Sequence, residues 1–203
     1  YGLIEVKRVM MSISNTMTIH TTSIDNIIVF DDFFEQSVFD DIISKSEYVP
    51  WKYCEVVSES KSFPTERFMT WNIYEEGTIH FDPMQLMEVI DEQCRKQIQN
   101  KKPEAIIHDM KRLRFNGTMQ GKGYTMWPHA DIHHQQETVW TIVVYLKGDG
   151  GTTFYKEKDG DLLTTVDFKP NRAVMFPSMY WHRAESPRDN YFRTSLGIVY
   201  MID

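Results

Sequence analysis

A chain of 203 residues that is 41% hydrophobic and 13% aromatic carries enough apolar side chains for one domain with a sizeable core. Its net charge of −7 disfavours nucleic acid as a partner, because proteins that neutralise phosphate backbones are usually basic. No apolar run approaches the ~18 residues of a membrane span, and no basic-then-apolar leader opens the chain. Two cysteines, Cys54 and Cys94, imply no disulfide framework. Together these features predict a cytoplasmic protein without a membrane anchor.

The N-terminal half predicts helices that brace a sheet. Residues 1–24 show no clear period and are expected to form an extension, which leaves a single domain over 25–203. Apolar residues at helical spacing predict amphipathic helices over 33–46 and 83–99. Strands are expected at 27–30, 51–57 and 65–74.

From residue 106 the pattern changes to short strands separated by Gly, Pro, Asn and Asp. Eight such strands after two helices predict a mainly β (α+β) fold, a closed or double-sheet antiparallel domain braced by two or more N-terminal helices. The clearest turns are 147–151 and 158–160. The strands are predicted at 107–116, 124–131, 137–147, 152–156, 162–168, 172–177, 180–185 and 191–201.

Two His-x-Asp pairs occur, and their surroundings separate them. Asp82 precedes Pro83 and a helical pattern, so it is interpreted as a helix N-cap and its pair with His80 as structural. His129 and Asp131 lie in an expected strand, where a spacing of two puts both side chains on one face. Two histidines and one carboxylate form the facial triad of non-haem Fe(II) oxygenases, although zinc is held by similar ligands.

The last strand carries an unusual face. Arg193, Ser195 and Gly197 share one side of it, and the apolar residues between them predict core packing on the other side. A buried arginine needs a partner, and its guanidinium grips a carboxylate with two parallel hydrogen bonds. His182 precedes Arg193 by eleven residues, enough for one turn that brings both to the same site. The sequence therefore predicts a metal centre beside a site for a small dicarboxylate.

The run from His129 to Tyr200 resembles the double-stranded β-helix (jelly-roll) core of the Fe(II)/2-oxoglutarate-dependent dioxygenases. It most resembles their prolyl-4-hydroxylase-like branch, which includes small phage and bacterial members. Each motif is short, and their shared order over about 70 residues is the specific signal. The matching segments are His129-x-Asp131, Tyr145-Leu146, Gly150-Gly151-Thr152-Thr153-Phe154, Lys169-Pro170-Asn171-Arg172 with Phe176-Pro177, Trp181-His182 and Arg193-Thr194-Ser195.

This resemblance implies an oxidoreductase whose Fe(II) is held by His129, Asp131 and His182, with Arg193 on the C5-carboxylate of 2-oxoglutarate. O2 would be the second co-substrate, and ascorbate would support activity. The implied reaction converts 2-oxoglutarate to succinate and CO2 and hydroxylates an unactivated C–H bond. Further contacts to 2-oxoglutarate are expected from Tyr145, Ser195, Thr141 and Tyr124.

Two positions depart from the family pattern. Phe115 stands where relatives often place a tyrosine that touches 2-oxoglutarate, and Asn116 or Tyr124 is a candidate to replace it. Arg193 stands where some hydroxylases have lysine. Asp131 is retained, and this favours hydroxylation or desaturation over halogenation, because related halogenases lose that carboxylate.

Other residues near the motifs have two interpretations. Trp127, Tyr180 and Trp181 are expected to pack or, alternatively, to line the pocket, and Trp140 to pack. Arg183 would reach substrate or solvent. His133 and His134 are expected in a loop, Arg172 in a turn, and His20 and His108 at structural or surface positions.

The substrate class stays open at this point. The resemblance suggests a peptidyl proline or a small amino-acid-like molecule, selected by loops near 57–64, 117–127 and 132–137. The alternatives are a non-catalytic, metal-containing (cupin-like) jelly-roll that binds a ligand, and a zinc or iron enzyme of this fold that does not use 2-oxoglutarate. Succinate formation, and its loss in Arg193→Ala, would distinguish these alternatives.

Overall fold

The computed structural model describes residues 22–54, 68–80, 82, 85–120, 128–132, 138–158 and 160–203. Most of the expected extension, Tyr124, Trp127, His133 and His134 lie outside the described residues, as does most of each loop expected to select the substrate. All the strand pairs described here are antiparallel.

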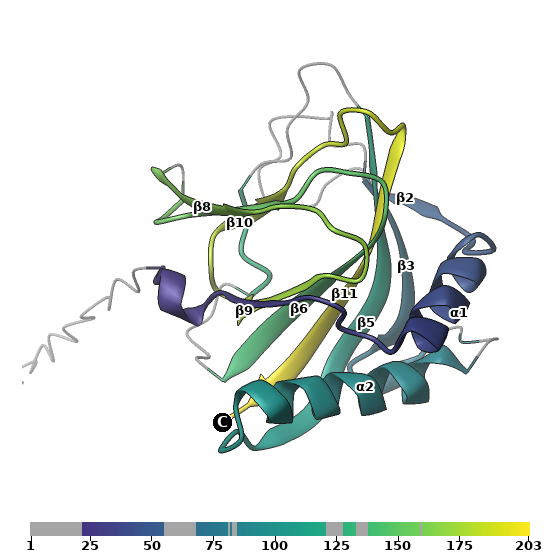
Figure 1. The fold of residues 1–203 in the computed structure, drawn as a ribbon, viewed down its shortest axis with the longest axis horizontal. Coiled ribbons are helices and arrows are strands. Elements are labelled where there is room, and N and C mark those ends of the chain that lie inside the picture. Colours follow the sequence, from purple (N-terminus) through teal and green to yellow (C-terminus); the bar gives the residue numbers. More distant parts are fainter. Residues whose placement is uncertain are drawn as a thin grey trace, which may run out of the picture.

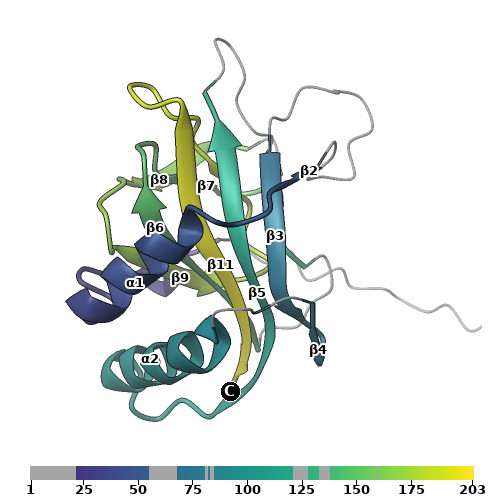
Figure 2. The same ribbon diagram turned by 90° about the vertical axis from the view of Figure 1, so that its right-hand side faces the viewer.

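Two sheets face each other (Figures 1 and 2). The larger has the order β1-β9-β6-β11-β5-β3-β2, with β4 on β3, and the smaller has the order β10-β7-β8. The large sheet comprises β1 (Ile28–Phe30), β2 (Lys52–Cys54), β3 (Phe68–Glu75), β4 (Thr78–Ile79), β5 (Ile107–Met119), β6 (Val139–Lys147), β9 (Ala173–Pro177) and β11 (Phe192–Ile202). The small sheet comprises β7 (Thr152–Tyr155), β8 (Leu162–Val166) and β10 (His182–Ala184).

Two α-helices cover the outer face of the large sheet, after a short 3-10 turn at Ile24–Asn26. Helix α1 spans Gln36–Ser46 and α2 spans Leu86–Lys101, so each begins about three residues later than predicted. The delay in α2 has a local cause, because Asp82 accepts hydrogen bonds from the backbone N–H groups of Leu86 and Met87 at 2.9 Å. Asp82 therefore caps the start of the helix through its side chain, but the N-cap residue is Gln85, so the predicted N-cap position is wrong by three residues. Among the described residues, Asp82 is not in the group that could hold a metal ion.

Alternation along the central strands separates the outer core from the inner face. Leu113 and Phe115 on β5, and Leu196 and Ile198 on β11, pack with the helices in the main hydrophobic core. The residues between them point to the space enclosed by the two sheets. The predicted core face of the last strand is therefore confirmed, and Arg193, Ser195 and Gly197 on its other face line a pocket.

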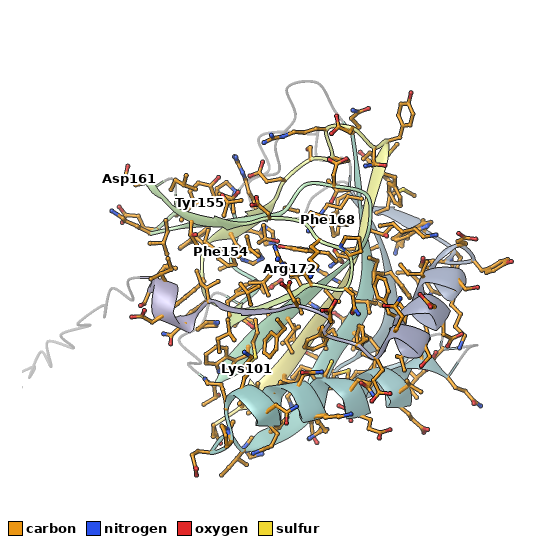
Figure 3. All side chains as sticks on the ribbon, in the orientation of Figure 1. Lys101, Phe154, Tyr155, Asp161, Phe168 and Arg172 are labelled. Carbon is orange, nitrogen blue, oxygen red and sulfur yellow. The ribbon has the colours of Figure 1, made fainter. Side chains whose placement is uncertain are left out.

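A second apolar cluster fills one end of the space between the sheets. Phe154 and Tyr145 are fully buried in it, and Phe168 stacks on the Tyr145 ring at 5.3 Å between centroids. Asp161, in contrast, lies at the exposed tip of the β7–β8 hairpin (Figure 3). This cluster holds the small sheet against the large one and leaves the other part of the enclosed space polar.

One predicted strand is wrong in its described part. Pro128 to Ile132 forms no strand, and only His129 makes an isolated bridge, to His182. Pro128 has no N–H to donate to a ladder. The N–H groups of Asp131 and Ile132 both bond to the carbonyl oxygen of Ser178, at 2.9 and 3.3 Å, instead of to a strand partner.

The described chain is thus mainly β with two helices. No helix in these described ranges is long and apolar enough to cross a membrane.

Candidate active site

His129, Asp131 and His182 meet at the inner face, with one potential ligand atom from each lying within 4.8 Å of the others. The backbone fixes this arrangement. His129 and His182 exchange two backbone hydrogen bonds, of 2.8 and 2.9 Å, and their ring centroids lie 4.5 Å apart. Among the described residues, this is the one group of three such side chains that could hold a metal ion.

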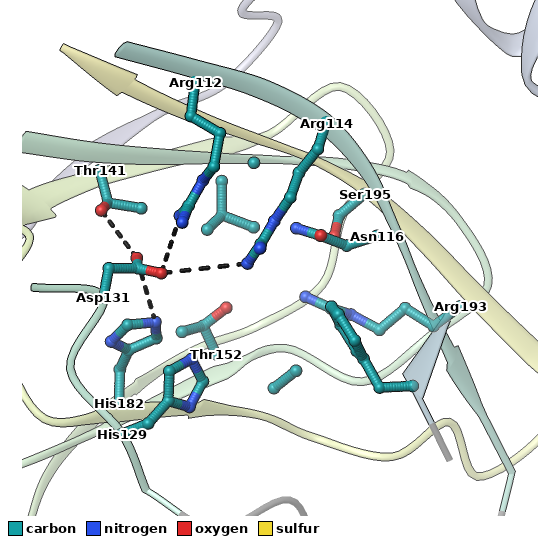
Figure 4. Close-up of a pocket in the computed structure, with 14 residues that line it drawn as sticks. Arg112, Arg114, Asn116, His129, Asp131, Thr141, Thr152, His182, Arg193 and Ser195 are labelled. Atoms are coloured by element: carbon teal, nitrogen blue, oxygen red, sulfur yellow. Dashed lines mark hydrogen bonds and ion pairs between the residues drawn. The ribbon is translucent and has the colours of Figure 1, made fainter. Parts of the chain in front are cut away.

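The Asp131 carboxylate is held from two sides (Figure 4). Thr141 donates its hydroxyl to Oδ2 at 2.8 Å, and Arg112 donates Nη2 to Oδ1 at 2.8 Å. Burial by itself would raise the pKa of Asp131, but the positive charge of Arg112, with further contributions from His182 and His129, holds that pKa well below its ordinary value. The carboxylate is therefore ionised and oriented before any ion binds.

His182 is set in the neutral tautomer that a metal ligand requires. Its Nδ1 lies 2.9 Å from the carbonyl oxygen of Tyr180, which can only accept, so Nδ1 carries the proton and Nε2 keeps its lone pair. Burial lowers the pKa of His182, although the nearby Asp131 opposes the shift. Nε2 faces Asp131 at 3.8 Å from Oδ2, within the cluster.

Arg193 lies in the same pocket and is almost completely buried, with 2% of its surface exposed. Its Nε donates to the carbonyl oxygen of Gly150 at 2.7 Å, and its guanidinium lies 5.2 Å from the centre of the Tyr145 ring. Its Nη2 is buried without a hydrogen-bond partner. Burial lowers the pKa of Arg193. A buried donor without a partner costs about 1–3 kcal/mol, so this end of the side chain is suited to an incoming acceptor.

The glycine-rich turn after β6 has a role in the site that its sequence did not reveal. Gly150 has a φ of +84°, and a Cβ at this position would lie 2.6 Å from the carbonyl oxygen of Glu185. Only glycine fits such a conformation and so close an approach. The turn thereby presents the Gly150 carbonyl to Arg193.

Two further arginines, Arg112 and Arg114 of β5, point into the pocket (Figure 4). Arg114 Nη2 lies 4.0 Å from the Asp131 Oδ1 that Arg112 contacts. The sequence showed these two beside Lys111 as a basic cluster and did not place them in the site. Strand alternation sends Lys111 to a different hollow and leaves both arginines inside.

The remaining predicted contacts divide into two groups. Ser195 and Thr141 line the pocket, as does Asn116, whereas Phe115 is buried in the outer core. Tyr145 is not among the lining residues, because its hydroxyl is directed to Thr152 Oγ1 at 2.9 Å and to the Val166 carbonyl at 3.2 Å. The described lining consists of Phe68, Arg112, Arg114, Asn116, His129, Asp131, Thr141, Val143, Thr152, His182, Ala184, Arg193, Ser195 and Gly197.

The aromatic residues beside the ligands pack elsewhere. The Tyr180 hydroxyl accepts hydrogen bonds from Ser23 N and Asn26 Nδ2, and Trp181 lies under Lys158. Arg183 pairs with Glu185 at 3.0 Å. None of these three residues is among the described residues that line the pocket, so the interpretation that they line it is not favoured.

Two imidazoles and one carboxylate on the inner face of a two-sheet β fold form a group that could hold one metal ion and leave coordination positions open. The comparisons indicate which family this chain resembles. Residues 113–200 match the family model of the 2OG-Fe(II) oxygenase superfamily. The resemblance inferred from the sequence is therefore confirmed, and it indicates a 2-oxoglutarate-dependent oxygenase. The expected co-substrate and metal, 2-oxoglutarate and Fe(II), are those of the matching family, and the His-Asp-His cluster is consistent with iron.

Solved structures share the fold at low identity. An oxidoreductase of the 2OG-Fe(II) oxygenase family from Burkholderia pseudomallei is 12% identical, with a TM-score of 0.62 over 88% of this chain and 84% of that one. A Trichoplax adhaerens prolyl hydroxylase, solved with a hypoxia-inducible-factor peptide, is 11% identical, with a TM-score of 0.59 over 88% and 84%. HygX from Streptomyces hygroscopicus, solved with nickel, 2-oxoglutarate and hygromycin B, is 10% identical, with a TM-score of 0.58 over 87% and 82%. No curated protein sequence matches this chain.

Proposed function

We propose that this protein is an Fe(II)- and 2-oxoglutarate-dependent dioxygenase with a jelly-roll core that hydroxylates an unactivated C–H bond of a peptidyl proline or a small amino-acid-like substrate. One observation carries the proposal. The buried, unpaired guanidinium nitrogen of Arg193 lines the same pocket as the clustered His129, Asp131 and His182. A metal ion alone would not require that arginine, whereas a dicarboxylate bound to the metal would.

The residues present fit both groups. His129, Asp131 and His182 would hold Fe(II) and leave positions for the co-substrates. Arg193 would take the distal carboxylate of 2-oxoglutarate, with Ser195 beside it on β11. With both bound, Fe(II), O2 and 2-oxoglutarate supply the oxidising power for C–H cleavage, and 2-oxoglutarate leaves as succinate and CO2.

The chain contributes positioning and charge. Thr141 and Arg112 fix the Asp131 carboxylate, the Tyr180 carbonyl fixes the tautomer of His182, and Gly150 fixes the near edge of the Arg193 fork. Retention of Asp131 favours hydroxylation over halogenation. The structural neighbours were solved with molecules as different as a hypoxia-inducible-factor peptide on the prolyl hydroxylase and hygromycin B on HygX, which supports keeping both a peptide and a small molecule in the proposal.

The decisive experiment is succinate formation from 2-oxoglutarate by protein that is loaded with Fe(II) anaerobically and then exposed to O2, alone and with pools of peptides and amino acids. We expect iron-dependent succinate that is abolished by His129→Ala or Asp131→Ala. Arg193→Ala should raise the 2-oxoglutarate KM at least tenfold, since a charge-assisted hydrogen bond contributes about 1.5–3 kcal/mol. His108→Ala is the matched control, because His108 is half-exposed and pairs with Asp203 on the surface.

Wild-type kinetics in the His129 or Arg193 variants would refute the assignment. Stoichiometric iron without any succinate would instead favour a binding module or a different co-substrate.

A further inference from the structure

We propose that Ser178 is a positioning residue for the metal centre, which holds Asp131 through its backbone carbonyl and, by way of the Thr141 hydroxyl, through its side chain. The inference rests on the metal site of the proposed function and deepens it, because it assigns the groups that keep a ligand carboxylate in place.

The backbone around Asp131 is held by Ser178, since Asp131 lies outside the described strands. The N–H of Asp131 donates to the carbonyl oxygen of Ser178 at 2.9 Å, and the N–H of Ile132 donates to the same oxygen at 3.3 Å. Ser178 directly follows β9 and donates its own N–H to the carbonyl oxygen of Val139 on β6 at 2.8 Å. The large sheet therefore sets the position of Ser178, and two backbone hydrogen bonds tie the ligand segment to it.

The side chains add a chain of two hydroxyl groups. Thr141 of β6 donates its one hydroxyl proton to Asp131 Oδ2 at 2.8 Å (Figure 4). Its oxygen lies 2.8 Å from Ser178 Oγ, and because its proton is already given to the carboxylate, Ser178 must be the donor of this second bond. Thr141 and Ser178 are 2% and 1% exposed, so both bonds are shielded from water. The chain thus runs in one direction, from Ser178 through Thr141 to Asp131.

This chain ends on the carboxylate oxygen that faces another ligand of the triad. Asp131 Oδ2 lies 3.8 Å from His182 Nε2, whereas Oδ1 accepts a hydrogen bond from Arg112 at 2.8 Å. A hydroxyl that accepts one hydrogen bond becomes a stronger donor in the next, so Ser178 should strengthen the bond from Thr141 to Oδ2. Hydrogen bonds to metal ligands typically change metal affinity about 10- to 100-fold, because they orient the ligand before the ion arrives.

The turn that contains Ser178 supports a second ligand as well. Tyr180 accepts the Nδ1–H of His182 with its carbonyl oxygen at 2.9 Å, and its own N–H donates to the carbonyl oxygen of Pro177 at 2.9 Å. Residues 177–180 therefore tie both Asp131 and His182 to the end of β9. A change in this turn should act on the metal centre although the Ser178 side chain is not part of the described pocket lining.

The role of Thr141 follows from the same bonds. Its one donor is directed to Asp131, and its oxygen accepts from Ser178. In this proposal Thr141 acts on the metal ligand and not on 2-oxoglutarate. Loss of either hydroxyl should thus weaken metal binding first, and 2-oxoglutarate binding only as far as that binding requires the metal.

Metal binding without turnover tests the proposal. The full chain is titrated anaerobically with Co(II), and the dissociation constant and the d–d absorption of the bound ion are recorded. We expect Ser178→Ala to weaken binding about three- to tenfold and Thr141→Val about 10- to 100-fold, each with a shifted d–d spectrum. Thr141→Ser keeps the hydroxyl and should restore the wild-type spectrum and most of the affinity. In the double variant Ser178→Ala should add less than about a twofold loss to that of Thr141→Val, because Ser178 acts through Thr141.

The matched control is Thr153→Val. Thr153 is also a buried threonine whose hydroxyl contacts another hydroxyl, that of Thr165 at 3.1 Å, and a carboxylate, that of Glu185 at 2.5 Å. It lies outside the described pocket lining, so its loss should leave Co(II) binding unchanged.

Three results would overturn the inference. The first is wild-type affinity and spectrum in Ser178→Ala. The second is a double variant whose loss equals the product of the two single losses, which would show that Ser178 acts independently of Thr141. The third is a loss in Thr153→Val as large as that in Ser178→Ala, which would make the effect one of general stability.

The two proposals fail separately. If the variants bind Co(II) as expected and Fe(II)-loaded wild-type protein forms no succinate, the positioning role stands and the proposed oxygenase function falls. If wild-type protein forms succinate and Ser178→Ala binds Co(II) as wild type does, the reverse holds. Failure of the wild-type protein to bind any metal would overturn both.

Discussion

Removing either partner of the contact between Arg112 and Asp131 should destabilise the metal-free protein. The two side chains are 17% and 6% exposed, and Arg112 Nη2 lies 2.8 Å from Asp131 Oδ1. Removing one of them therefore leaves the charge of the other unpaired and poorly solvated. Breaking a buried ion pair from one side costs about 3–5 kcal/mol, and the remaining exposure of Arg112 favours the lower end. Asp131→Asn should therefore lower the free energy of unfolding by about 3 kcal/mol. At this chain length, that loss corresponds to a Tm decrease of about 6–12 °C.

A double-mutant cycle isolates the pair. Arg112→Met keeps the volume of the stem and leaves Asp131 with Thr141 and with the more distant Arg114, so its cost should be smaller, about 1–2 kcal/mol. In the double variant neither charge is left without its partner. Its loss of unfolding free energy should therefore be about 2 kcal/mol smaller than the sum of the losses in the two single variants. The assay is urea unfolding at pH 7 in the presence of a chelator. Additivity within about 0.5 kcal/mol would show that the contact does not couple the two residues and would refute this reasoning.

Two further predictions concern the buried groups around the triad. Burial lowers the pKa of His182, so as pH falls below the unfolded value of about 6.5 the unfolded chain takes up a proton that the folded chain resists. Metal-free protein should lose stability from pH 7 to pH 5, by at most about 1.4 kcal/mol per pH unit, and urea unfolding of His182→Gln should show a shallower slope; equal slopes would exclude His182 as the cause. Tyr145→Phe removes the hydroxyl bonded to Thr152 and to a backbone carbonyl, and it should cost about 1–2 kcal/mol in thermal unfolding. Its 2-oxoglutarate KM should rise less than that of Arg193→Ala, and an equal rise would place the hydroxyl in the co-substrate site.

Much of the site could be predicted because it rests on local rules. Period-two alternation on β11 sorted Arg193 and Ser195 from Leu196 and Ile198, and the packing confirms that sorting. The spacing of His129 and Asp131 also brought both to one place. It did so for a different reason from the one expected, because bonds to His182 and to Ser178 hold the segment instead of a strand ladder.

The inner face of β5 could not be predicted from the chain alone. Arginine in a strand is usually solvated, and Lys111 beside Arg112 and Arg114 gave the segment the composition of a surface edge. Only the pairing of β5 between β3 and β11 puts the two arginines inside. That pairing joins residues about 80 positions apart, Gly197 with Arg114 for example, and no local pattern encodes it.

The same electrostatics connect stability with function. In the metal-free protein Asp131 is the one carboxylate of the described lining, it lies beside Arg112 and Arg114, and Arg193 keeps a buried nitrogen without a hydrogen-bond partner. Apolar residues of similar size would give a more stable pocket, because a buried charge is rarely repaid in full by its partners. The arrangement becomes favourable when anions arrive, since each ligand that binds only the folded state adds its binding free energy to stability. Under the proposed function, the metal at the triad and the dicarboxylate at Arg193 would supply the charges and the hydrogen-bond acceptor that this pocket lacks.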